Sequence, residues 1–144
     1  MSLYTPWAAA RTQLLAHIAS AWSPTTTAKN GYEVFPTAAA LPFVRLRTVG
    51  GADITGGDTP TLDAASVQFE ISGLFAKVAN TDAEDYLMDK AEDLRNLIAS
   101  DHHLNNAVSD CTVTSFELVA PDLEPNDDRW GVTLQVLCLI HYDR

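Results

Sequence analysis

Apolar residues recur at helical spacing near the start of the chain. They are Trp7, Ala10, Leu14, Ile18 and Ala21. Intervals of three and four place these side chains on one face of a helix. Thr5 and Pro6 suit the N-cap and the first helical position, and Pro24 disfavours a helical conformation in the residue before it. The pattern predicts a helix over about residues 6–21.

A second stretch with the same spacing covers residues 81–100. Its predicted buried positions are Ala83, Leu87, Ala91, Leu94 and Ile98. Thr81 and Glu84 have the separation of a capping box, and the acidic residues that follow Thr81 favour the positive end of a helix dipole. We therefore predict a second amphipathic helix, which ends before the pair His102-His103.

Alternation of apolar and polar residues predicts four strands, at about 42–47, 66–77, 111–119 and 130–142, with a short extended piece at 32–35. The clearest is 66–77, where Val67, Phe69 and Ile71 alternate with Gln68 and Glu70. The glycine-rich segment 48–63 and the acidic segment 120–129 are predicted to be long loops.

The last strand is the most apolar segment of the chain. One face carries Val132, Leu134, Val136, Cys138 and Ile140, and the other face carries Thr133, Gln135, Leu137, Leu139 and His141. A strand with one apolar face and one mixed face is central in its sheet or covered on its second side. We expect this strand to be central, with its remaining apolar area covered by a neighbouring subunit.

These elements follow one another in the order α-β-β-α-β-β. The length of 144 residues suits one domain, and no linker divides the chain, so residues 1–144 are predicted to form a single domain. The predicted fold class is α+β, with a mixed or antiparallel sheet of about four strands and two helices on one face.

Charge and composition exclude several classes of function. Nineteen acidic residues against nine basic ones give a formal charge of −10, and the basic residues are scattered, which argues against specific nucleic-acid binding. No segment approaches the ~20 apolar residues that cross a bilayer, so no membrane partner is expected. The first residues lack the basic and apolar regions of a signal peptide, so a cytosolic protein is expected.

The sequence carries no catalytic signature. It has no G-x-S-x-G, C-x-x-C or H-x-x-x-H motif, and His102-His103 is interpreted as a solvated helix end. Asp53, Asp58 and Asp63 do not follow the spacing of an EF-hand. Cys111 and Cys138 are predicted to be buried free thiols, although a disulfide between them stays open. We predict no catalytic residue, no cofactor and no metal site.

The arrangement of elements nevertheless resembles a known family. The helix is followed by the strand Pro42-Phe43-Val44-Arg45-Leu46, a Gly/Asp/Thr-rich segment, the strand SVQFEISGLFAK, an Ala/Leu/Asp helix and a final W-x-V-x-L-x-V strand that begins at Trp130. In this layout, which covers nearly the whole chain, the protein is similar to the tail terminator proteins of long-tailed bacteriophages and prophages. The resemblance rests on the pattern of elements and on no invariant motif.

This resemblance implies a structural, non-enzymatic protein. Members assemble as a ring, typically a hexamer, that caps the tail tube, ends its polymerisation and presents a surface to the head connector. The implied partners are other copies of the chain, the major tail tube protein and the head–tail connector protein, with DNA passing through the ring. The implied location is the virion tail, after assembly in the host bacterial cytoplasm.

The resemblance also gives the candidate site residues. Loops and the last strand are expected at subunit boundaries, so the candidate interface residues are Asp53, Ile54, Asp58, Trp130, Leu137 and Leu139. For Trp130, a place in the core is the equal alternative. The candidate acids that face the lumen are Asp122, Glu124, Asp127 and Asp128, for which a merely solvated loop is the alternative.

Two other functions stay open from the sequence. The nearer one is another ring protein of the phage neck or tail, such as a tail completion or head–tail joining protein. The more distant one is a small ferredoxin-like domain that binds a ligand or acts as an enzyme.

Overall fold

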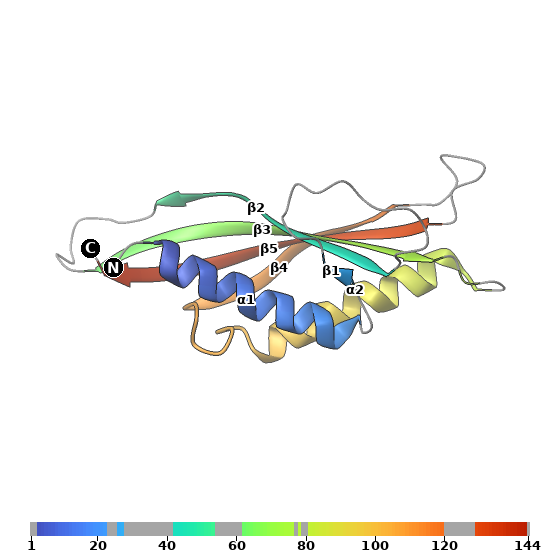
Figure 1. Cartoon of the computed structure of the whole chain (residues 1–144), viewed down its shortest axis with the longest axis horizontal. Coiled ribbons are helices and arrows are strands. Elements are labelled where there is room, and N and C mark those ends of the chain that lie inside the picture. Colours follow the sequence, from blue (N-terminus) through green and yellow to red (C-terminus); the bar gives the residue numbers. More distant parts are fainter. Residues whose placement is uncertain are drawn as a thin grey trace.

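The computed structural model describes residues 3–22, 26–27, 42–53, 62–76, 78, 81–119 and 129–143. These residues form two helices, α1 (Tyr4–Ala21) and α2 (Ala83–Ser100), and five strands: β1 (Thr26–Thr27), β2 (Phe43–Asp53), β3 (Leu62–Ala76), β4 (Asp110–Val119) and β5 (Arg129–Asp143). Both helices lie on one face of the sheet (Figure 1). The predicted α+β class and the α-β-β-α-β-β order are confirmed, and β1 is an additional two-residue strand.

The strands lie in the order β1-β2-β3-β5-β4. β1 is parallel to β2, and all other neighbours are antiparallel. β5 therefore lies between β3 and β4, which confirms the prediction that the last strand is central. β3 and β5 pair along their full lengths of 15 residues.

The predicted loop at 48–63 is wrong at both of its ends. β2 continues through Gly50 and Gly51 to Asp53, and β3 begins at Leu62. Glycine is required at position 51 because the neighbouring backbone comes close: a Cβ on Gly51 would lie 2.2 Å from the carbonyl oxygen of Ser66. A register shift between Thr48 and Gly50 marks an irregularity in this pairing. Residues 54–61 and the extended piece predicted at 32–35 lie outside the described residues.

Both predicted helix starts need a small correction. α1 begins at Tyr4 with Leu3 as its N-cap and without a side-chain cap, so Thr5 is not the cap. Pro6 lies in the first turn, where its missing N–H costs nothing. In α2 the cap is Asp82, whose carboxylate accepts a hydrogen bond of 3.1 Å from the backbone N–H of Asp85. Asp82 is therefore the N-cap of α2, one residue after the predicted Thr81.

The core lies between the two helices and the inner face of the sheet. Its helical contributors are Ala10, Leu14, Ile18, Leu87, Ala91, Leu94 and Ile98, which confirms most of both predicted stripes. They pack on buried strand residues such as Phe69, Ile71 and Val136, and this apolar burial is the main stabilising term. Trp22, at the end of α1, donates a hydrogen bond of 2.9 Å from its indole to the carbonyl of Lys90 and so ties the two helices together.

Candidate functional site

The face of the sheet that the helices leave uncovered carries a polar cluster centred on Glu70. Arg47 Nε donates to one carboxylate oxygen of Glu70 at 2.9 Å, and Gln135 Nε2 donates to the other at 2.9 Å. Gln68 Nε2 in turn donates to Gln135 Oε1 at 2.9 Å. The cluster joins β2, β3 and β5 across this face. It does not include Leu137 or Leu139, so the predicted cover of their apolar area by a neighbouring subunit stays a prediction.

The environment of Glu70 favours its ionised form. Partial burial by itself would raise the pKa of Glu70, but the hydrogen bonds from Gln135 and Arg47 and the charges of Arg47 and Arg45 outweigh it. The pKa of Glu70 therefore lies below its ordinary value. The Glu70 carboxylate bonds to Arg47 of β2 and to Gln135 of β5. Both contacts hold neighbouring strands together, so we interpret the Arg47–Glu70 ion pair as structural.

The candidate interface residues on β5 differ in accessibility. Leu137 is 39% exposed on the outer face and Leu139 is half-buried there, so both can contact another molecule. Trp130 is only 2% exposed and packs edge-to-face on Tyr86, with ring centroids 5.6 Å apart. Trp130 thus occupies the core, the alternative that the sequence left open.

The remaining sequence candidates cannot be placed. The side chain of Asp53, the residues Ile54 and Asp58, and the four acids Asp122, Glu124, Asp127 and Asp128 lie outside the described residues. Their assignment to an interface or to a lumen stays a prediction.

All four histidines of the chain gather around the turn that follows α2. His17 lies 3.0 Å from Asp101, and His102 lies 3.1 Å from Asp110. His103 lies 2.8 Å from the carbonyl of Ser109, whose hydroxyl contacts His141. The sequence predicted a solvated helix end for His102 and His103 and missed His17 and His141, because those come from α1 and β5. Within the described ranges, no three His, Cys, Asp or Glu residues are placed to hold a metal ion.

The two cysteines face each other across β4 and β5. Both are buried and free, with their sulfur atoms 3.3 Å apart, which confirms the prediction of buried thiols. The hydrogen bond with Cys138 and burial raise the pKa of Cys111. Because the thiolate is the reactive form, Cys111 is poorly suited to nucleophilic chemistry.

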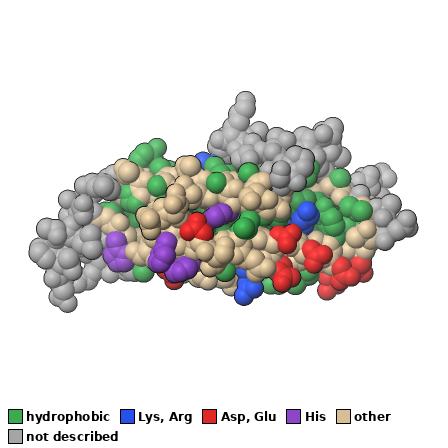
Figure 2. All heavy atoms as spheres, turned by 90° about the horizontal axis from the view of Figure 1, so that it is seen from below, with side chains coloured by type: hydrophobic (Ala, Val, Ile, Leu, Met, Phe, Trp, Pro, Cys, Tyr) green, Lys and Arg blue, Asp and Glu red, His purple; other side chains and the backbone are tan. Residues whose placement is uncertain are grey.

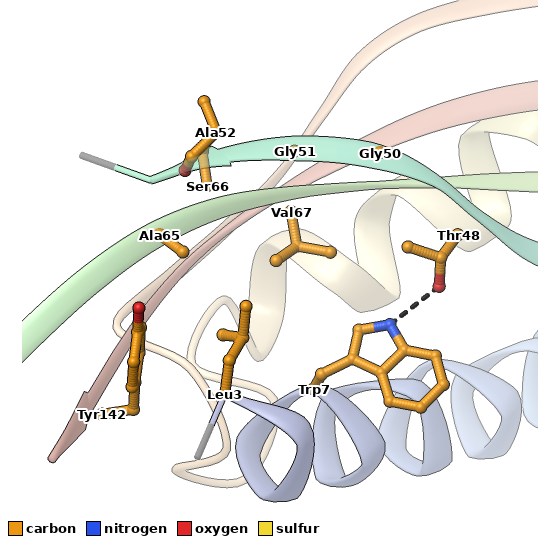
Figure 3. A pocket seen from close by; sticks show the side chains of 10 residues that line it. All are labelled: Leu3, Trp7, Thr48, Gly50, Gly51, Ala52, Ala65, Ser66, Val67 and Tyr142. Atoms are coloured by element: carbon orange, nitrogen blue, oxygen red, sulfur yellow. Dashed lines mark hydrogen bonds between the residues drawn. The ribbon is translucent and has the colours of Figure 1, made fainter. Parts of the chain in front are cut away.

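A cavity of about 350 Å³ lies beneath β2 and β3 at the start of α1 (Figure 3). Leu3, Trp7, Val67 and Tyr142 give it an apolar lining. The hydroxyl of Thr48 accepts a hydrogen bond of 2.7 Å from the Trp7 indole, so this polar group is already engaged. A small-molecule site needs several convergent polar groups, and this cavity offers few.

A second hollow, of about 370 Å³, lies between α2 and the edge strand β4. We call it the α2–β4 groove; its lining is Met88, Ala91, Glu92, Arg95, Val113, Phe116 and Leu134. Phe116 is 50% exposed and Met88 is 40% exposed. The sequence did not predict this groove, because a register shift between Val113 and Ser115 turns Phe116 to the helix side of the sheet, opposite Leu134.

The side of the sheet formed by β2, beyond the two residues that pair with β1, also exposes apolar side chains. Tyr4 is 69% exposed and its ring lies 5.4 Å from that of Trp7. Val49, which follows Thr48 in β2, is 47% exposed. We call Tyr4, Trp7 and Val49 the α1–β2 patch. α1 contacts β2 and β5, whereas α2 contacts β4 and β5, so the α1–β2 patch and the α2–β4 groove lie toward different sides of the sheet.

In the described part of the chain, neither helix combines the length and the apolar character of a membrane span. No protein-family model matches the chain, and no curated protein sequence matches it. Among solved structures, it is similar to a chain from a structure described as the virion of a native gene transfer agent (GTA) particle. That similarity has a TM-score of 0.41 and 13% sequence identity, and it covers 94% of this chain and 93% of the other. At this level the comparison assigns neither a family nor a function.

Proposed function

We propose that this protein is a structural, non-enzymatic component of a phage-type tail. It forms a ring, with six copies as the expected number, that caps the tail tube, ends its polymerisation and offers a surface to the head connector. Its partners are then its own copies, the tail tube protein and the connector protein.

The observation that carries this proposal is the exposure of large apolar side chains on two different sides of the subunit. Tyr4 and Val49 lie on one side, and Met88 and Phe116 lie on the other. Exposed apolar patches mark interaction surfaces, and a protein with two such patches on different sides can contact two neighbours at once. A closed ring requires two contacts per copy.

The described polar clusters support the non-enzymatic part of the proposal, because their contacts hold elements of the fold together. Glu70 and its partners join neighbouring strands, and the histidines bond to one turn. The sequence resemblance to tail terminator proteins suggests where the ring lies, namely at the end of a tail tube. Another neck or tail ring protein remains the nearest alternative, because it would show the same exposed patches.

The net charge of −10 also suits a ring that DNA traverses. Repeated around a ring, negative charge repels phosphate and lets DNA pass without binding. We propose Asp122, Glu124, Asp127 and Asp128 as the acids that line this passage. Replacing all four by their amides should leave assembly intact and raise the retention of DNA in a filter-binding assay. Unchanged DNA retention would show that these four acids do not line the lumen.

The test of the ring is a mass measurement in solution. Sedimentation velocity with light scattering should give one closed species of several copies at moderate concentration, and negative-stain images should show rings. In a tube-assembly reaction, added protein should shorten the tubes. Rings that leave tube length unchanged would favour a different position in the neck or tail, and a chain that stays monomeric at every concentration would contradict the proposal.

A further inference from the structure

We propose that Tyr4 of one copy inserts into the α2–β4 groove of the next copy. This inference rests on the proposed ring and names the contact that builds it. It takes a second copy of this chain as the occupant of the groove, and it follows from four properties of the two surfaces.

The first property is their position. The α1–β2 patch and the α2–β4 groove differ in composition and lie toward different sides of the sheet, one at β2 and the other at β4. A contact between them is heterologous, so each copy uses one surface toward one neighbour and the other surface toward the next. Contacts of this kind build a ring when the rotation from one copy to the next closes, and an open filament when it does not.

The second property is the shape and chemistry of the groove. Its walls are apolar, from Met88, Val113 and Phe116, whereas Glu92 and Arg95 lie at its polar side. A tyrosine combines a flat apolar ring with a hydroxyl at the tip. The ring would pack on Phe116 and on the thioether of Met88, and the hydroxyl would reach Glu92 or Arg95.

The third property is the contact of Tyr4 with a tryptophan that is itself held in place. Its ring lies against Trp7, and Trp7 is held by the 2.7 Å hydrogen bond from its indole to Thr48. A side chain that is already positioned loses less conformational entropy when it binds. Tyr4 therefore projects from a rigid base and is the most exposed of the large apolar side chains in the described part of the chain.

The fourth property is charge. α2 carries five acidic residues, Glu84, Asp85, Asp89, Glu92 and Asp93, and many acids gather toward one end of the helix face in Figure 2. α1 carries no acidic residue and contains Arg11. Like charges across an interface cost free energy, so the acidic face of α2 is better matched by the acid-free α1 of a neighbour than by another α2.

The strands at the two surfaces also indicate that side chains make this contact, because among the described residues β2 is free of β1 beyond Val44 and β4 is an edge strand. Both β2 and β4 contain a register shift, between Thr48 and Gly50 and between Val113 and Ser115. Irregularities of this kind disfavour the addition of a further strand to an edge. The docking of a tyrosine into a groove needs no continuous pairing of backbones.

The test uses the full chain with one substitution on each surface. Tyr4→Ala removes the inserted ring and Phe116→Thr removes one wall of the groove; both side chains are at least half exposed, so folding should survive, which circular dichroism verifies. Each variant should associate roughly tenfold or more weakly than the wild type and run as a monomer in sedimentation. Val78→Thr, which changes an exposed apolar side chain that lines neither surface, is the matched control and should form the normal ring.

An equimolar mixture of the Tyr4→Ala and Phe116→Thr variants distinguishes a heterologous contact from a symmetric one. The first variant keeps an intact groove and the second keeps Tyr4, so the mixture should form dimers that cannot grow further. A variant that forms dimers alone, or a mixture that remains monomeric, would overturn the inference. Rings that persist in both single variants would overturn it and leave the ring proposal standing, whereas a monomeric wild type would contradict the ring itself.

Discussion

Trp22 lies directly against Gly73. A Cβ at position 73 would come within 2.8 Å of Trp22 Cζ3 and within 3.2 Å of the Phe75 ring. Trp22 is buried, stacks edge-to-face on Phe75 and is tied to α2 by its indole hydrogen bond, so it cannot easily move. We predict that Gly73→Ala overpacks the core and destabilises the protein by about 1–3 kcal/mol, measured by denaturant unfolding.

Gly50→Ala is the control for this prediction. A Cβ at Gly50 would meet nothing within 4 Å, so the substitution should change the free energy of unfolding little. Equal losses in the two variants would mean that strand flexibility, and not contact with Trp22, sets the requirement for glycine.

A second prediction concerns Trp130, which is buried and packs on Tyr86. Trp130→Ala should cost about 3–5 kcal/mol of stability, because it leaves a large cavity. Its indole nitrogen is buried and has no hydrogen-bond partner among the described residues, so Trp130→Phe should cost clearly less. A Trp130→Ala variant that is folded and fully stable but fails to assemble would show that Trp130 acts at the interface.

A third prediction follows from the lowered pKa of Glu70. A carboxyl whose pKa falls on folding stabilises the native state above its unfolded pKa, and this contribution disappears as the pH drops through the folded pKa. Glu70→Gln should therefore destabilise the protein at neutral pH and approach the wild type in acid, below the ordinary pKa of 4.5. Urea unfolding at about pH 7 and about pH 3 tests this, with the exposed Glu117→Gln as control. A constant difference between wild type and Glu70→Gln would contradict the assignment.

A fourth prediction concerns the end of β5. Deleting residues 139–144 removes the buried Ile140 and the part of β5 that pairs with Leu62–Ser66 of β3. The deletion should abolish folding, seen as a loss of the cooperative thermal transition. Removal of Asp143 and Arg144 alone should be tolerated. A soluble deletion variant that assembles normally would show that this end of the strand is dispensable.

The sequence predicted the elements wherever a hydrophobic pattern was long and regular. The stripe through Leu87, Leu94 and Ile98 gave α2, and the apolar character of β5 gave its central position, because both patterns report burial directly. The cap at Asp82 was missed by one residue, since Thr81 and Asp82 are both good caps and only backbone geometry chooses between them.

The surfaces were harder to predict than the elements. Phe116 faces the helix side because of a register shift in β4, and alternation along a sequence cannot locate such a shift. Gly50 and Gly51 were assigned to a loop on composition, although both pair with β3 as part of β2. The contacts of His17 and His141 with the turn after α2 join residues far apart in the chain, which local patterns do not reveal.

The uninterrupted pairing of β3 with β5 has a mechanical consequence. Fifteen residues of each strand lie in one register with no shift, and at about 3.3 Å per residue this ribbon is about 50 Å long. A force that slides the two strands past each other loads the hydrogen bonds of the ladder together, whereas a force that peels one strand from its end breaks them one after another. The subunit should therefore resist stretching along its strands far better than it resists peeling.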